Sequence, residues 1–163
     1  MSEKDYRLRT LMSVRERAKQ EQSRVVSTRR AQLEEAEAEL ARREREVSRC
    51  RERQEAARRR MMEEAAGGTG AAQLVKHRTH LAELRQSEQE LLAAVSRQKG
   101  VVTRCASELE SALERLREAS KELKVIEKHK ERWQEEQRLE GARREQKIND
   151  ELAAILHEKR SSE

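Results

Sequence analysis

This chain of 163 residues has no proline and no phenylalanine, and it has only one tryptophan and one tyrosine. A globular domain of this length normally builds its core from many aromatic and branched apolar residues. Hydrophobic residues make up 34% of this sequence, whereas charged residues make up 42%. The composition argues against a compact globular domain and leaves two classes, a disordered chain or a protein of long helices.

Long apolar runs are missing as well. No segment approaches the roughly 20 consecutive apolar residues that a membrane-spanning helix needs. The N-terminal segment MSEKDYRLRTLMSVRER also lacks the apolar core and the cleavage site of a secretory signal. We therefore expect a cytoplasmic protein that does not insert into a membrane.

What the sequence has instead is a set of strong helix formers with a heptad pattern. In the second half, a 3-4 spacing runs from Leu74 to Trp133, and 14 of its 18 positions are apolar. The polar exceptions are His77, Glu88, Gln98 and Lys130. A stripe of this length is typical of a coiled coil. A shorter stripe follows at Ile148, Leu152 and Ile155 or Leu156.

The first half has a poorer stripe. Every seventh residue from Met12 to Met61 gives six apolar residues out of eight, but the companion positions include Arg15, Gln22 and Arg29. Arginine can lay its methylene groups over an apolar surface while its charge stays in water. This half cannot form a seam alone, so we expect it to pack against the second half.

Three glycines, Gly67, Gly68 and Gly70, fall within four positions between the two halves. Each glycine in a helix interior costs roughly 1 kcal/mol relative to alanine, and glycine readily takes the left-handed backbone that ends a helix. The cluster therefore predicts a hairpin turn. A flexible kink in one continuous rod is the alternative.

The predicted fold is all-α, a long antiparallel two-helix coiled-coil hairpin that forms one domain. We expect helix one at about 5–65, the turn at 66–71 and helix two at about 72–160. At about 1.5 Å per residue, helix one is about 90 Å long and helix two about 135 Å, so the second helix overhangs at the C-terminus. Facing residue numbers then add to about 137, which places Glu88 near Arg49 or Arg53.

Residues that could carry chemistry do not gather into a recognisable site. A helical hairpin offers no concave pocket for catalysis, and the GGTG segment lacks the spacing of a phosphate-binding loop. His77 and His80 lie one turn apart, but no cysteine or carboxylate cluster accompanies them, so a metal site is not expected. We predict no enzyme activity, no catalytic residue and no cofactor.

The net charge of +5 is unevenly distributed. Residues 7–60 carry 17 basic and 10 acidic side chains, whereas residues 134–163 carry 6 basic and 8 acidic ones. Glutamates interrupt almost every basic cluster, which is typical of a solvated helix face with i, i+4 ion pairs. Aromatic residues for base stacking are also missing, so nucleic-acid binding is the weaker alternative. The pattern favours a helical protein that contacts other proteins.

Two segments and one C-terminal pattern are distinctive. The segments are YRLRTLMSVRERAKQEQSRVVSTRRAQLEEAEAELARREREV and ASKELKVIEKHKERWQEEQRLEGARREQKINDELAAIL. In the second, Trp133 is followed seventeen residues later by Asp150 and Glu151. Together they resemble the FliJ/YscO family of type III secretion and flagellar export, and most of all its chlamydial-type YscO homologues. Flagellar members carry aromatic side chains along the shaft, where this chain has mostly Leu, Val or Ala.

The resemblance implies a stalk similar to the rotary stalk of F- and V-type ATPases. Family members bind the hexameric ATPase of a bacterial type III secretion apparatus, whose central hole the terminal end of the stalk is thought to enter. They also contact the export gate and secretion chaperones. The resemblance thus implies a cytoplasmic protein, peripheral to the apparatus at the inner membrane, that couples the ATPase to protein export. It implies no small-molecule substrate, and we expect the isolated chain to be a monomer.

We expect the ATPase contacts at the open end of the hairpin, where both termini lie. The candidate partner-binding residues are Tyr6, Arg7, Arg9, Trp133, Arg143, Arg144, Lys147, Asp150 and Glu151. Tyr6 and Trp133, the only aromatic residues, are expected within about one helical turn of each other, where they can also simply plug the open end. Each charged candidate can also be only a solvated charge. Two other functions stay open: a generic scaffold coiled coil and a basic nucleic-acid-binding coiled coil.

Overall fold

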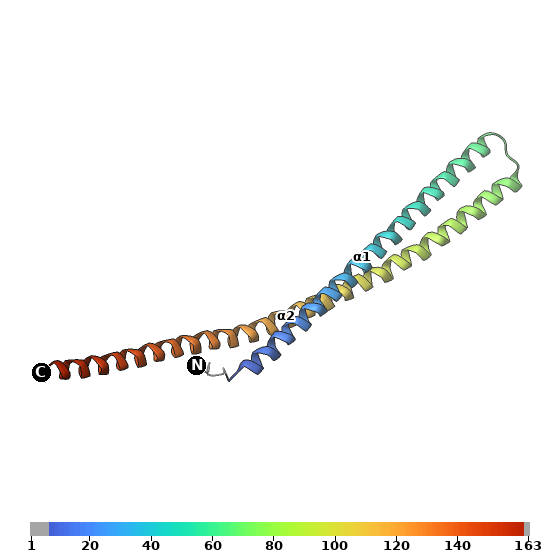
Figure 1. Ribbon diagram of the computed structural model, residues 1–163. Coiled ribbons are helices and arrows are strands. Elements are labelled where there is room, and N and C mark those ends of the chain that lie inside the picture. Colours follow the sequence, from blue (N-terminus) through green and yellow to red (C-terminus); the bar gives the residue numbers. More distant parts are fainter. Residues whose placement is uncertain (1–6, 162–163) are drawn as a thin grey trace. The chain divides into compact units, whose positions relative to one another are not determined.

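The computed structural model describes residues 7–161, with side chains described through Lys159. Helix α1 spans Arg9–Ala66 and helix α2 spans Ala71–Ser161 (Figure 1). Within residues 7–161 there is no strand, and a turn of four residues joins the two helices. The predicted fold class, an all-α antiparallel helical hairpin, is confirmed.

A glycine motif ends α1 at the turn. Gly68 has a φ of 81°, a left-handed backbone that side-chain-bearing residues rarely adopt. Its N–H donates to the carbonyl of Ala65 at 3.3 Å, and the N–H of Thr69 donates to the carbonyl of Glu64 at 3.2 Å. The Thr69 hydroxyl donates to the same carbonyl at 2.6 Å. These bonds satisfy carbonyl groups that the end of a helix leaves without partners.

Contacts divide the chain into two units, which are described separately. The turn unit is Ser23–Glu114, and the terminal unit combines the residues up to Gln22 with those from Arg115 onward. The buried side chains of the turn unit are Val26, Ala36, Val47, Cys50, Gln54, Ala57, Leu81, Leu84, Val95 and Ala112. Those of the terminal unit are Ala119, Leu123 and Ile126. Each core is thin because a pair of helices encloses only the seam between them.

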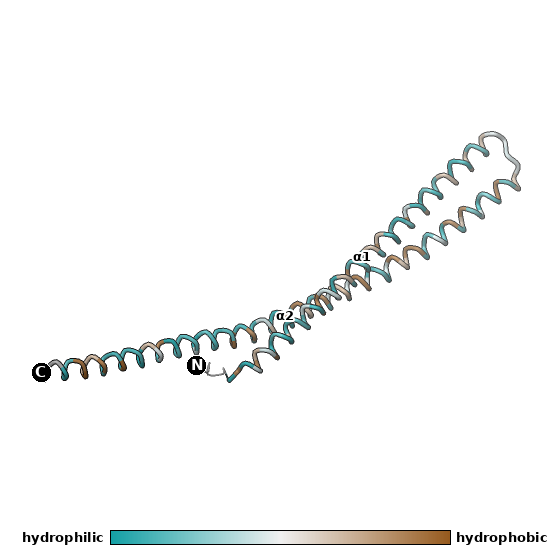
Figure 2. The backbone as a smooth tube through the Cα atoms, viewed as in Figure 1, coloured by the Kyte–Doolittle hydropathy of each residue, from teal (hydrophilic) through white to brown (hydrophobic). Residues whose placement is uncertain are grey.

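The heptad stripe of α2 is its packed face. All 18 stripe positions from Leu74 to Trp133 are buried or half-buried, including the four polar ones. Hydrophobic residues recur at intervals along α2 among more hydrophilic ones (Figure 2). The period follows from helix geometry, since positions three and four apart share one face. The spacing therefore predicted which side of α2 packs.

Half-buried arginines complete the poorer stripe of α1. In the terminal unit, Arg15 pairs with Glu122 at 2.5 Å. In the turn unit, Arg29 pairs with Glu108 at 2.7 Å. The residue numbers of both pairs add to 137, so the predicted register is confirmed. Each arginine lays its methylene groups along the seam and places its charge on a carboxylate of the other helix.

Two glutamines of the turn unit reach across the seam to backbone carbonyls of the opposite helix. Gln54, which is 5% exposed, donates to the carbonyl of Leu84 at 3.2 Å and to the carboxylate of Glu88 at 2.8 Å. Gln98 donates to the carbonyl of Ala36 at 2.9 Å. One glutamine comes from each helix, so a shift of register would move both amides away from their acceptors, which is costly for buried polar groups.

The partner of Glu88 differs from the prediction. Glu88 pairs with Arg51 at 2.6 Å, and not with Arg49 or Arg53. Arg51 lies on the flank of α1 that faces Glu88, whereas Arg49 and Arg53 line a groove on another flank. The hydrogen bonds from Arg51 and Gln54 hold the pKa of the Glu88 carboxyl below its ordinary value.

Candidate functional site

The C-terminal segment of α2, residues 134–159, is the most exposed part of the terminal unit. From residue 142 to residue 159 every side chain is exposed. In Figure 1 this red end of α2 continues past the start of α1. The Arg15–Glu122 pair explains why, because it places Arg9, the first residue of α1, level with about residue 128. The C-terminal segment therefore has no described residue of α1 opposite it.

Large aliphatic side chains form an exposed stripe on this segment. The C-terminal stripe consists of Ile148 (56% exposed), Leu152 (53%), Ile155 (53%) and Leu156 (63%). Their spacing of four, three and one places them on one side of the helix. No described residue covers this side. Closer to the turn, apolar residues with the same spacing form the seam between the two helices. An exposed apolar patch with polar neighbours is typical of a protein interaction site.

The predicted charged residues divide between two sides of the segment. Arg144, Lys147 and Glu151 follow one another at i, i+3 and i+7, so they share the side that borders the C-terminal stripe. Arg143 and Asp150 are seven residues apart and lie opposite the C-terminal stripe, next to Lys147, which is four residues after Arg143 and three before Asp150. All five are exposed. Helix geometry thus places three of the five predicted residues on the side that borders the apolar stripe, and the other two opposite the stripe but one turn from Lys147.

Ion pairs within the segment support its helix. Arg138 donates to both carboxylate oxygens of Glu135, at 2.7 and 2.9 Å, and Arg144 donates to Glu140 at 2.6 Å. The Arg138 hydrogen bond lowers the pKa of the Glu135 carboxyl, and the same contact raises the pKa of the guanidinium. Pairs at this spacing add modest stability to an exposed helix, which helps a segment that no described residue of α1 packs against.

The other predicted partner-binding residues lie where the seam ends. Trp133 is half-buried, and Arg7 and Arg9 are exposed. Tyr6 lies outside the described residues, so its proximity to Trp133 stays a prediction. Trp133 is also the last residue of the long heptad stripe. It therefore marks the point where a face that packs in the seam becomes a face open to a partner.

The histidines near the turn have a structural setting. Nε2 of His77 lies 2.6 Å from a carboxylate oxygen of Glu64, across the seam next to the turn. Within residues 7–161 no three metal-ligating side chains come close enough together to hold an ion. Neither described helix contains a stretch apolar enough to cross a bilayer.

The C-terminal stripe was not among the predicted site residues. Its heptad spacing was visible in the sequence and indicated a short resumption of the seam. Whether such a stripe is buried depends on where the opposite helix begins, and spacing carries no information about that. The predicted hairpin has a shorter first arm and an overhanging second helix, which already implied that Ile148 and Leu152 are open to a partner.

Comparisons with known proteins match nearly the whole chain. The model of a family described as YscO-like protein matches residues 3–163. A solved structure, described as that of a candidate YscO homologue, CT670 from Chlamydia trachomatis, is similar with a TM-score of 0.79 and 27% sequence identity. That similarity covers 97% of this chain and 98% of the other. A comparison with curated proteins gives no match.

Proposed function

Because this chain belongs to the YscO-like family, which is associated with type III secretion, we propose that it is a stalk component that binds the hexameric export ATPase. In this role it couples the ATPase to protein export, and it contributes no chemistry of its own. Contacts with the export gate and with secretion chaperones are part of the same proposal. So is a location at the inner membrane, peripheral to the secretion apparatus.

The observation that carries the proposal is the C-terminal stripe. Its four aliphatic side chains are each more than half exposed. Full burial of one such side chain stabilises a complex by about 1.5–3 kcal/mol, so the stripe can supply much of the binding free energy. Arg144, Lys147 and Glu151 beside it provide charges that can select a partner and fix the rotation of the helix. A single helix is also slim enough to enter a ring.

Substitutions in the stripe test the proposal directly. The double variant I148D/L152D places two carboxylates in the surface that we expect the ATPase to cover. Its matched control is V75D/V125D, since Val75 (61% exposed) and Val125 (68% exposed) are aliphatic residues of α2 outside the stripe. We expect the first variant to bind the cognate export ATPase at least about tenfold more weakly, whereas the control stays within about twofold of wild type. Affinity can be measured by surface plasmon resonance on the full-length chain.

Deletion of residues 134–163 provides the second arm of the test. Because ATPase contacts are assigned to this segment, the truncated chain should no longer bind, while its circular dichroism still shows a helical fold. Undiminished binding by the truncated chain would show that the ATPase contacts another part of the hairpin. Equal loss in I148D/L152D and V75D/V125D would mean that the stripe has no special role.

A further inference from the structure

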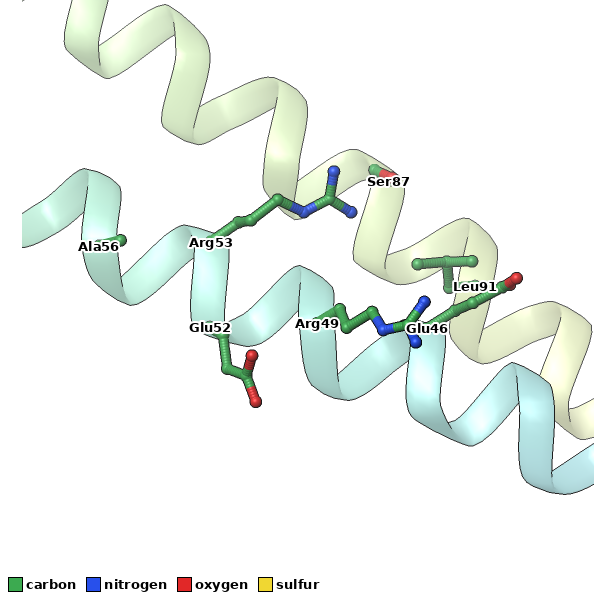
Figure 3. Close-up of a pocket in the computed structure, with 7 residues that line it drawn as sticks. All are labelled: Glu46, Arg49, Glu52, Arg53, Ala56, Ser87 and Leu91. Atoms are coloured by element: carbon green, nitrogen blue, oxygen red, sulfur yellow. The ribbon is translucent and has the colours of Figure 1, made fainter.

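A groove runs along one flank of the turn unit. Residues from both helices line it, as Figure 3 shows. They include Glu46, Arg49, Arg53 and Ala56 from α1 and Ser87 and Leu91 from α2. The side chains of Ala56 and Leu91 are half-buried, so the groove has an apolar floor between charged edges.

Two arginines dominate this groove. Arg49 and Arg53 are four residues apart, so they lie one above the other on the same side of α1. In Figure 3 both side chains extend from α1 toward α2. Both residues are exposed. In the described chain neither guanidinium has a carboxylate within 4.0 Å, whereas Arg29 and Arg51 of the same helix are paired with Glu108 and Glu88.

The charge balance of α1 changes where the groove begins. Residues 23–48 carry six basic and six acidic side chains, so their charges cancel. Residues 49–60 carry six arginines and only two glutamates. Of these six arginines, Arg49 and Arg53 line the groove and extend toward α2. Arg51 pairs with Glu88 on another flank, and Arg58 pairs with Glu55.

We propose that this groove is the docking site of an acidic α-helix of a partner protein, which lies along it as a third helix. A groove between two packed helices has the shape that receives the ridge of another helix. Carboxylates one turn apart on that helix repeat about every 6 Å, which matches the rise between Arg49 and Arg53. An apolar side chain between the carboxylates can rest on the floor at Leu91.

The glutamates at the edge distinguish this partner from a polyanion. Glu46 and Glu52 also line the groove, so a continuous row of phosphates would meet carboxylates as well as guanidiniums. A helix avoids this repulsion because it can place its own carboxylates against Arg49 and Arg53 and basic or neutral residues elsewhere. The docking surface uses none of the residues assigned to the ATPase, so the two proposals can fail independently.

A synthetic helix can serve as the probe. We would titrate the full-length chain with a peptide of three heptads, about 21 residues, that has leucine at a and d. Its glutamates stand at b and e, so that they follow one another three and four residues apart along one edge of the apolar stripe. The groove variant is R49E/R53E. Its control is R30E/R97E, because Arg30 and Arg97 are exposed arginines of the same unit that do not line the groove. By calorimetry we expect the groove variant to lose at least about tenfold in affinity and the control less than about twofold.

A charge-reversed peptide completes the experiment. With lysine in place of glutamate, the peptide should bind R49E/R53E more tightly than it binds wild type, which general unfolding of the variant cannot produce. No binding of the glutamate peptide to wild type would overturn the proposal. Equal losses in both variants would also overturn it, since net charge alone would then explain binding. Tighter Arg49- and Arg53-dependent binding of heparin, or of phosphatidylglycerol vesicles, would reassign the groove to polyanions or lipid.

Discussion

Single glycine residues act in opposite ways in this hairpin. Gly68 has a φ of 81° at the end of α1, where an added Cβ would be strained whatever the free space around it. Gly100 lies inside α2, and an added Cβ there would meet nothing within 4 Å. The same substitution should therefore destabilise the protein at one position and stabilise it at the other.

We expect Gly68→Ala to lower the free energy of unfolding by about 1–2 kcal/mol, the cost of a left-handed alanine. Gly100→Ala should raise it by up to about 1 kcal/mol, because alanine is the better helix former and meets no steric obstacle. Urea unfolding followed by circular dichroism measures both values. A Gly68→Ala variant as stable as wild type would show that residue 68 does not hold the left-handed turn conformation in solution.

The environment of Glu88 makes part of the stability depend on pH. Hydrogen bonds from Arg51 and then from Gln54 lower the pKa of its carboxyl in the folded state. Its contribution is therefore complete above its unfolded-state pKa of about 4.3 and is lost as pH falls through the lower folded-state value. We expect the difference in melting temperature between wild type and E88Q to be constant above about pH 5.5 and to shrink below about pH 4.3. A difference that persists unchanged at about pH 3 would contradict this account.

The two helices differ in how well the sequence predicts them. For α2 the apolar spacing predicted the packed face along the whole stripe from Leu74 to Trp133. This works because helix geometry places positions three and four apart on one side, whatever the rest of the chain does. The pairing of Arg15 with Glu122 shows that the register of α1 was predictable too. The glycine turn fixes the point from which facing residues of the two helices are counted.

Other features of the helices depend on information that spacing lacks. Facing residue numbers that add to about 137 place Arg49 level with Glu88, and Arg51 and Arg53 within about one turn of it. The flank of α1 on which each arginine lies selects Arg51. Gln54 and Gln98 look like interruptions of the stripes in sequence. Their acceptors are backbone carbonyls, which every residue has, so no sequence pattern marks the partner of each amide.

The sequence predicted where the candidate site lies, but it predicted only some of the residues that form it. The C-terminal motif and the break after Trp133 indicated the exposed end of α2, and the charged residues there are exposed. Helix geometry then places Arg143 and Asp150 opposite the aliphatic stripe, whereas Arg144 and Glu151 border it. The aliphatic stripe was not among the predicted residues, although the predicted overhang of the second helix already implied that it is exposed, and the start of α1 at Arg9 agrees with that overhang.

For the molecule as a whole, we expect a monomer of 19.1 kDa in solution. The stripe of α2 has its partner in the same chain, and a turn of four residues keeps that partner at high effective concentration. The cross-seam bonds of Gln54 and Gln98 also favour this pairing over one between two chains. Light scattering coupled to size exclusion measures the mass. A mass of twice this value over a range of concentrations would favour the scaffold alternative.

The apolar cluster beside the turn also bears on the order of events during synthesis. Ala57, Leu81 and Leu84 form this cluster, and Met61 packs against it. On the ribosome α1 is completed first, and its stripe is too poor to hold a seam. Pairing becomes possible once Leu84 has emerged, because the loop between Ala57 and Leu84 is short and loop-closure entropy grows with loop length. Each later turn of α2 then adds to an existing pair, so closure of the hairpin can begin before its C-terminal segment has been translated.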